Sequence, residues 1–401
     1  MKKTLLIAVG VCAASGALAA PSVSDVLVRQ QWPWRSSIRV DFLLDGRGTS
    51  DVKFAFTAYD GETRLGEIPD AAIVGDKFAD RNGLKTVLID PALVPALRDV
   101  GRLSAFRLTV SCTEVGEVLY KLIDLTKRRG DDGHIRYLTA ADLKTNAYGL
   151  WAADFVPGVT SIAWPGVAAD KTYCRDILVL RRIRPGTFGF GATAVPTTLT
   201  QGYWIGVFPV TGIQYDTVAQ TADSTAANEN LPKRRISPNA LRGADLSWPR
   251  DGHRVASDSF FGKLAALVGE GGFDLPTEAQ WEYACRSGTT DNAIYRSDRT
   301  LGEVAVFGAS GCAEVGTKYP NAWGLYDMLG LAWEHVLTRF DAAGVTGGFD
   351  PVGPETSVCT ARGGSFASGA ANVSCVSRNG DATVEHTSLY HGFRVVQNEN
   401  W

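Results

Sequence analysis

The sequence Leu-Pro-Thr-Glu-Ala-Gln-Trp-Glu-Tyr-Ala-Cys-Arg occupies residues 275–286 and carries the strongest structural signal in the chain. Thr277 is followed three positions later by Gln280, which is the spacing of a capping box at the start of a helix. Pro276 stands directly before the predicted cap. We therefore predict a helix over residues 277–286.

One face of this predicted helix is apolar. Trp281, Ala284 and Cys285 share the spacing that places side chains on the same side of a helix, and we interpret Trp281 as a core aromatic residue. Glu278 and Glu282 lie one turn apart, a spacing that an acid pair would also have. Instead of an acid pair, we expect both carboxylates to lie on the helix surface and to form hydrogen bonds that hold the framework of the domain together.

Four more segments in the second half of the chain have recognisable patterns. They are residues 180–188, 203–215, 320–334, and 362–366 with a continuation at 392–396. Together with residues 275–286, they resemble, in this order, the formylglycine-generating enzyme (sulfatase-modifying factor) superfamily. The resemblance implies an irregular α+β domain, related in fold to C-type lectins, over residues 176–398.

Shorter elements fit this expectation. The apolar patterns predict strands at 177–183 and 203–210 and helices at 213–219 and 257–269. Asp258 or Ser257 is the expected cap of the last helix. The two glycines after Arg362 indicate positive φ or a close backbone approach. We interpret them as framework, because neither a helix nor a Lys-Ser/Thr pair follows, as a phosphate loop requires.

The first part of the chain has the pattern of a small all-β domain. Residues 38–44 and 52–59 alternate apolar and polar side chains, and turn residues separate several such runs. We predict a β-sandwich-like domain over residues 25–126, with a structural or adhesive role. We interpret residues 127–175 as a linker or an extension packed on one of the domains.

Composition excludes two broad classes of partner. The 401 residues are 45% hydrophobic and 21% charged, and the net charge of −3 gives no reason to expect nucleic acid or an anionic membrane. No run of residues is apolar for long enough to predict a membrane span in the mature protein. We expect an unidentified ligand, either a protein or a glycan.

The first 19 residues have the pattern of a signal peptide. Two lysines at positions 2 and 3 precede a short apolar stretch at 5–14, and Ala17-Leu18-Ala19 is a small-x-small cleavage site. Val11 stands before Cys12 where a lipoprotein signal has a small residue, so we predict no lipid anchor. The expected location is the periplasm, the cell surface or the outside of the cell.

Six cysteines remain after removal of that signal, and they allow 15 pairings, among which spacing cannot choose. In members of the superfamily, a cysteine on the helix pairs with one in the C-terminal loop, which here implies Cys285–Cys375. The remaining pairs are inferred only from proximity and domain membership; they are Cys312–Cys359 and Cys112–Cys174.

The chain departs from the superfamily at the positions that the oxidases use for copper(I). Those enzymes carry two cysteines shortly after the Arg-Gly-Gly-Ser motif, and here the positions hold Ser368 and Val373. A serine hydroxyl is a poor ligand for a soft metal and is redox-inert. Cys375 is the only cysteine after Arg362, so the loop itself does not provide a pair, and we do not expect copper.

The calcium-binding pattern of the superfamily is also altered. Where members have an asparagine that supplies a hard oxygen ligand, this chain has Leu331. We expect no cofactor and leave calcium open, with Asp327 and backbone carbonyls as its candidate ligands.

Our leading functional hypothesis is a non-catalytic binding or structural module. The polar segment 367–390 is its expected binding surface. The candidate binding residues are Ser368, Asn372, Arg378, Asn379, Glu385, His386 and Tyr390. Two alternatives remain: a divergent oxidase that converts a protein cysteine to formylglycine, and a display protein whose C-terminal loop is diversified. The candidate acid–base groups are His253, His335, His386 and His391. We favour surface or hydrogen-bonded histidines, because no nucleophile stands at a recognisable spacing.

Overall fold

The computed structural model describes residues 5–6, 20–30, 36–98, 103–144, 166–243 and 254–399. The chain separates into two compact units. The first comprises Met1–Val118, Arg129–His134 and Thr139–Ala141, and the second comprises Leu119–Arg128, Ile135–Leu138 and Asp142–Trp401. Most of the expected signal segment lies outside the described residues, as do His253 and much of the expected linker.

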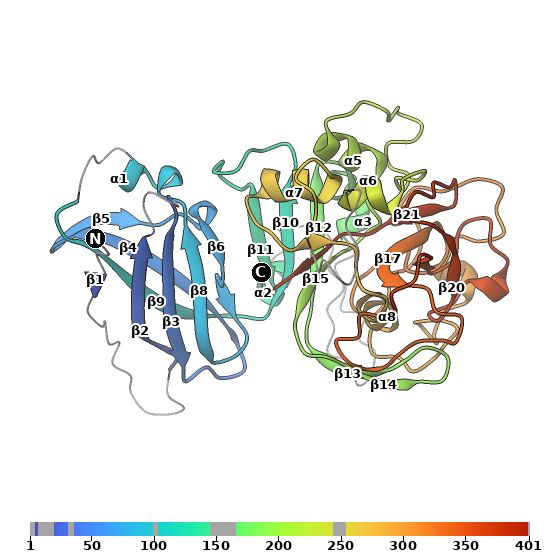
Figure 1. Ribbon diagram of the computed structural model, residues 1–401, viewed down its shortest axis with the longest axis horizontal. Helices are drawn as coiled ribbons and strands as arrows, with labels where there is room; N and C mark the ends of the chain where they lie inside the picture. The colour runs from blue at the N-terminus through green and yellow to red at the C-terminus, as the bar shows by residue number, and fades with distance from the viewer. Residues whose placement is uncertain are drawn as a thin grey trace. The chain divides into compact units, whose positions relative to one another are not determined.

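The first unit contains two antiparallel sheets (Figure 1). One has the order β1-β2-β3-β8-β6, and in the other β4 pairs with β5, β7 and β9. The strands are β1 (Leu5–Leu6), β2 (Ser22–Gln30), β3 (Ile38–Asp45), β4 (Asp51–Asp60), β5 (Thr63–Glu67), β6 (Ile73–Gly75), β7 (Phe78–Ala79), β8 (Gly83–Ile89) and β9 (Phe106–Gly116); a short helix, α1 (Pro95–Arg98), lies between β8 and β9. This arrangement is the sandwich that the alternating patterns predict.

The core of the first unit joins these two sheets. Phe42 of β3 meets Phe54 and Phe56 of β4 edge to face, with ring centroids 4.7 and 5.9 Å apart. All three rings are buried because alternate positions along a strand face the same side of a sheet.

The second unit is mixed, and its largest sheet has the order β11-β10-β12-β15-β22-β16. Its strands are β10 (Val118–Asp124), β11 (Ile135–Thr139), β12 (Ile177–Ile183), β15 (Tyr203–Gly206), β16 (Phe273–Asp274) and β22 (Val396–Asn398). The strand predicted at 177–183 is β12. Strand β10 pairs antiparallel with β12, from Tyr120 opposite Arg181 to Asp124 opposite Ile177. The chain therefore first passes into the second unit at Val118–Leu119 rather than near residue 126, and Arg129–His134 and Thr139–Ala141 return to the first unit.

Two smaller sheets complete the second unit. One has the order β20-β19-β17-β21, and the other has the order β13-β14-β18. Their strands are β17 (Trp333–Arg339), β19 (Cys359–Arg362), β20 (Arg378–Ala382), β21 (His391–Phe393), β13 (Gly186–Phe190), β14 (Val195–Leu199) and β18 (Gly348–Phe349). The helices are α2 (Ala140–Lys144, which begins in the first unit), α3 (Gly166–Ala169), α4 (Thr172–Arg175), α5 (Gly212–Ala219), α6 (Pro238–Arg242), α7 (Phe260–Val268), α8 (Glu278–Arg286) and α9 (Leu301–Val304).

Helix α8 lies where the sequence predicts it. Thr277 caps it, and the reciprocal bonds with Gln280 form the complete capping box. Helix α7 also forms, but its cap is Ser259, which accepts a hydrogen bond from Gly262 N, so the predicted caps Asp258 and Ser257 are wrong. Three polar residues in a row precede this helix, and the one directly before its first turn has the geometry of a cap.

No helix among the described residues is long and apolar enough to cross a membrane.

Candidate functional site

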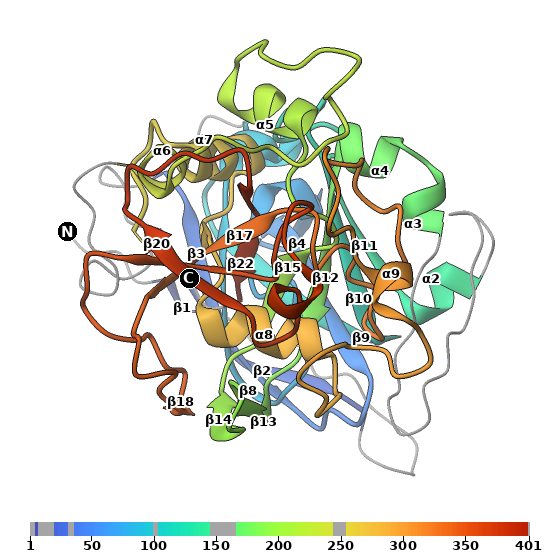
Figure 2. The ribbon, with the colours of Figure 1, turned by 90° about the vertical axis from the view of Figure 1, so that its right-hand side faces the viewer.

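The site is built on helix α8, which packs against β17 and β19. It also contacts β13 and β14, which lie beside it in Figure 2. Trp281, Ala284 and Cys285 are fully buried, as predicted. Glu278 and Glu282 are 1% and 0% exposed, so our placement of these carboxylates on the helix surface is wrong. Their framework role is confirmed by the ion pairs described next.

A buried guanidinium holds the two carboxylates together. Arg362 Nη1 donates to Glu278 Oε1 over 2.8 Å, and Arg362 Nη2 donates to Glu282 and to the Cys375 carbonyl. Burial by itself would lower the pKa of Arg362, but the carboxylates of Glu282 and Glu278 raise it overall. The acid pair is thus a charge-compensated crosslink between α8, β19 and the C-terminal loop.

The turn after Arg362 brings this loop close to the core. Gly363 and Gly364 both have φ of 91°, as the sequence predicts. A Cβ on Gly363 would lie 2.7 Å from the Met328 carbonyl oxygen, and one on Gly364 would lie 2.8 Å from the Asn372 carbonyl oxygen. Only glycine fits both positions.

The two positions that we matched to the oxidase cysteines from the resemblance lie in this loop. The Ser368 hydroxyl accepts a hydrogen bond from Ser365 N over 3.0 Å and lies 3.1 Å from the Ser365 hydroxyl. Val373 is 2% exposed and belongs to the apolar core that contains Cys375. One position therefore stabilises a turn, and the other fills the core.

All six described cysteines are thiols in this structure. Cys285 and Cys375 are fully buried in the same apolar core, and burial followed by the proximity of Cys375 raises the pKa of Cys285. Their disulfide stays a prediction, although the two side chains are neighbours.

The tentative pairs receive no such support. Cys312 lies against the carbonyls of Ala313 and Leu331, whereas Cys359 accepts a hydrogen bond from Arg339 Nη1 over 2.6 Å. Cys112 and Cys174 belong to different units.

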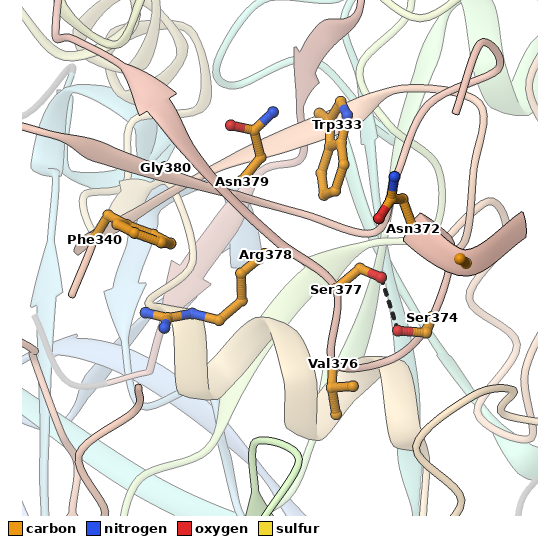
Figure 3. Close-up of a pocket in the computed structure, with 10 residues that line it drawn as sticks. Trp333, Phe340, Asn372, Ser374, Val376, Ser377, Arg378, Asn379 and Gly380 are labelled. Atoms are coloured by element: carbon orange, nitrogen blue, oxygen red, sulfur yellow. Dashed lines mark hydrogen bonds between the residues drawn. The ribbon is translucent and has the colours of Figure 1, made fainter. Parts of the chain in front are cut away.

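A pocket of about 580 Å³ opens beside β20 and the loop that precedes it (Figure 3). It is lined by Trp333, Phe340, Ala371, Asn372, Ser374, Val376, Ser377, Arg378, Asn379 and Gly380. Figure 3 shows Trp333 and Asn372 at one end and Phe340 at the other, with the side chains of Arg378 and Asn379 between them. Of the seven predicted binding residues, the structure brings Asn372, Arg378 and Asn379 together here.

The other four predicted binding residues do not line this pocket. Ser368 is engaged with Ser365, and Glu385 accepts a hydrogen bond from the Asn239 amide. Tyr390 is 44% exposed and packs on Phe366, with ring centroids 5.6 Å apart. The His386 ring faces the His391 ring at 5.4 Å. The segment 367–390 thus forms more than one surface.

The described histidines do not form a recognisable metal centre. His335 is fully buried, which fits the hydrogen-bonded alternative of our expectation rather than the surface one. Its Nε2 lies 3.2 Å from the Ile236 carbonyl oxygen, while Nδ1 has no hydrogen-bond partner. Burial, with a smaller contribution from His391, lowers the pKa of His335 to about 3. Among the described residues, no group of three or more His, Cys, Asp or Glu side chains could hold a metal ion.

The side chains at the altered calcium pattern do not fit this ion. Asp327 is buried and accepts a hydrogen bond from Gly316 N over 2.7 Å, and burial raises its pKa to about 6. Both oxygens of Glu334 are taken by Arg394 and by the Trp281 indole. The side chain of Leu331, which stands in place of the asparagine ligand of the superfamily, has no ligand atom.

The comparisons agree with the five sequence segments. The profile of the family described as "Sulfatase-modifying factor enzyme 1-like domain" matches residues 171–399, more than half of the chain. The chain therefore belongs to this family. It is 33% identical over 120 residues to the formylglycine-generating enzyme of Mycobacterium tuberculosis, a match that covers 25% of this chain and 38% of that protein. The chain thus matches less than half of the length of this curated relative.

Two solved structures are similar at lower identity. Treponema denticola variable protein 1 has a TM-score of 0.45 and 21% identity, covering 55% of this chain and 95% of that one. PvdO from Pseudomonas aeruginosa has a TM-score of 0.44 and 18% identity, covering 56% of this chain and 96% of that one.

Sequence reasoning missed several pocket residues. Trp333 was identified only as part of a family motif, and Phe340 was not singled out. Ser374 and Ser377, whose hydroxyls lie 2.8 Å apart, were not predicted as binding residues either. The polar composition of segment 367–390 indicated a binding surface in general. It did not indicate these residues, because β17 is far in the sequence from β20 and the loop before it.

Proposed function

We propose that the domain over residues 171–399 is a non-catalytic binding module. The observation that carries this proposal is the pair Ser368 and Val373 at the positions of the oxidase cysteines. Ser368 stabilises a turn through Ser365, and Val373 is buried in the core, so neither side chain offers a thiolate to a metal or to oxygen.

The surroundings of Cys375 support the same conclusion. This residue is fully buried beside Cys285, and its carbonyl accepts a hydrogen bond from Arg362. A catalytic thiol needs access to its substrate and a pKa that allows the thiolate to form. A residue inside the framework crosslink has no such access.

The pocket beside β20 is the ligand site that we propose for this module. Its volume of about 580 Å³ lies in the range of small-molecule sites, and its lining combines aromatic rings with a few polar groups. Three of the binding residues expected from the sequence line it. We further propose export by the N-terminal signal, supported by Lys2, Lys3 and the apolar residues that follow.

A copper(I) titration tests the missing oxidase site. The full chain, purified without reductant, is titrated with copper(I) against a competing chelator, and the Cys375→Ser variant serves as the matched control. We expect both proteins to retain the same amount of copper. If the unaltered chain retains one more copper ion than the variant, Cys375 is a copper ligand and the proposal is wrong.

A further inference from the structure

The pocket beside β20 has the polarity of a site for a neutral ligand rich in hydroxyl groups, and we propose that it binds an uncharged saccharide. This inference rests on the proposed function, since it assigns a ligand class to the same pocket. Three features carry it: the compensated charge of the lining, the inventory of polar groups, and the two aromatic side chains.

The single charged residue in the lining is already paired. The Nε and Nη2 atoms of Arg378 donate to both carboxylate oxygens of Glu278, the second over 3.0 Å, and Nη1 donates to the Asp341 carbonyl over 2.9 Å. The guanidinium also lies 4.8 Å from the centre of the Phe340 ring. A carboxylate or phosphate ligand would have to compete with Glu278 for this cation. The pocket therefore disfavours anionic ligands.

The remaining polar groups both donate and accept hydrogen bonds. The Ser374 and Ser377 hydroxyls lie 2.8 Å apart, and their mutual bond uses only one of the two hydroxyl protons. The amide of Asn372 is exposed in the lining. Trp333 is 8% exposed, and no described residue accepts a hydrogen bond from its indole N–H. This N–H is not among the fully buried polar atoms, so it can donate to an acceptor on a ligand.

Sugar hydroxyls match this mixed set, because each hydroxyl donates one hydrogen bond and accepts others, as the serine pair does. The aromatic side chains give the pocket apolar walls, against which the C–H groups of a sugar can pack. Trp333 and Phe340 lie at opposite ends of the pocket (Figure 3).

An aromatic ring covers one face of the strand that lines the pocket. A Cβ on Gly380 would lie 2.2 Å from Phe340 Cγ, so the Phe340 ring packs directly on the backbone of β20. At the pocket, the middle of this strand therefore presents an aromatic wall.

Calorimetric titration of the full chain tests this inference. The probes are the neutral disaccharides lactose, maltose, cellobiose and N,N′-diacetylchitobiose, the anionic 3′-sialyllactose, and a panel of uncharged hexapeptides. We expect at least one neutral sugar to bind, and 3′-sialyllactose to bind no more tightly than lactose. Loss of one hydrogen bond in Asn372→Ala should weaken binding about tenfold. Trp333→Phe, which removes the indole N–H, should have a similar effect.

Thr383→Ala is the matched control, because Thr383 is exposed in the same segment but lies outside the pocket. Asn372 is exposed, so its variant remains informative if Trp333→Phe fails to fold. The inference is overturned if no neutral sugar binds, if the anionic sugar binds more tightly, or if both pocket variants bind as the control does. Peptide binding that Asn372→Ala abolishes would also overturn it, but would leave the proposed binding function intact. Copper retained through Cys375 would instead overturn the proposed function.

Discussion

At the residue scale, Arg362 determines how the buried acidic pair of α8 is stabilised. We predict that Arg362→Met, which keeps much of the side-chain volume, lowers the free energy of unfolding by about 3 kcal/mol, because the carboxylates of Glu278 and Glu282 lose a buried partner. Urea denaturation of the two proteins measures this difference.

Lys171→Ala is the control for this prediction. Lys171 pairs with Glu314 over 2.7 Å, but both side chains are about half exposed, so the loss should stay under about 1 kcal/mol. Equal losses in the two variants would show that the buried network has no special importance for stability.

His335 makes stability depend on pH. Its folded-state pKa of about 3 is below its ordinary value of 6.5, so the unfolded chain binds the proton first as the pH falls. The stability that the neutral ring contributes is fully present above pH 6.5 and is lost as the pH falls from 6.5 to 3. By pH 4, the loss is about 3 kcal/mol. His335→Phe should therefore lose less stability than the unaltered chain between pH 7 and pH 4. The midpoint of urea denaturation is measured for both proteins between pH 7 and pH 4. An equal decrease in the two midpoints would contradict the role of His335 in the pH dependence.

Single residues also show where sequence reasoning reached its limit. The capping box at Thr277 and the glycines after Arg362 were predictable, because local backbone chemistry determines both. The burial of Glu278, Glu282 and His335 was not, because it depends on Arg362, Arg378 and the neighbouring strands, which are distant in the sequence.

At the element scale, the turn between β19 and the C-terminal loop depends on Gly363. We predict that Gly363→Ala lowers the free energy of unfolding by at least about 2 kcal/mol, because alanine is strained at positive φ and its Cβ would overlap the Met328 carbonyl. Gly369→Ala is the control, since nothing lies within 4 Å of a Cβ there. Thermal unfolding of both variants measures the difference. A control as unstable as Gly363→Ala would refute the role of this turn.

Elements with strong periodicity were predicted well. Strand β12 and helices α7 and α8 lie at or within a few residues of their expected bounds. Strand β10 was expected in the first domain, because an apolar run does not reveal its pairing partner. Its pairing with β12 places all but its first residue in the second unit.

At the scale of the whole molecule, one predicted crosslink would join helix α8 to the C-terminal loop. A disulfide between Cys285 and Cys375 closes a loop of about 90 residues and should stabilise the fold by roughly 4 kcal/mol in the chain-entropy model. We expect peptide mapping without reductant to recover these two cysteines in one crosslinked fragment, and reductant to lower the unfolding temperature. Recovery of both as free thiols from protein purified without reductant would contradict the pairing.

The binding site was predictable only in part at this scale. The polar segment 367–390 pointed to Asn372, Arg378 and Asn379, which line the pocket. It also pointed to Ser368, Glu385 and Tyr390, which contact other parts of the unit. The pocket walls from β17 required the three-dimensional arrangement of the strands.

Conversion of a cysteine-containing sulfatase peptide is the most direct test of our proposal that the domain is non-catalytic. The full chain is incubated with the peptide, copper(I) and oxygen, and the peptide mass is followed, with the formylglycine-generating enzyme of Mycobacterium tuberculosis as the active control. Our account predicts an unchanged peptide, because Ser368 and Val373 provide no thiolate pair. Conversion of the cysteine to formylglycine by this chain would contradict it.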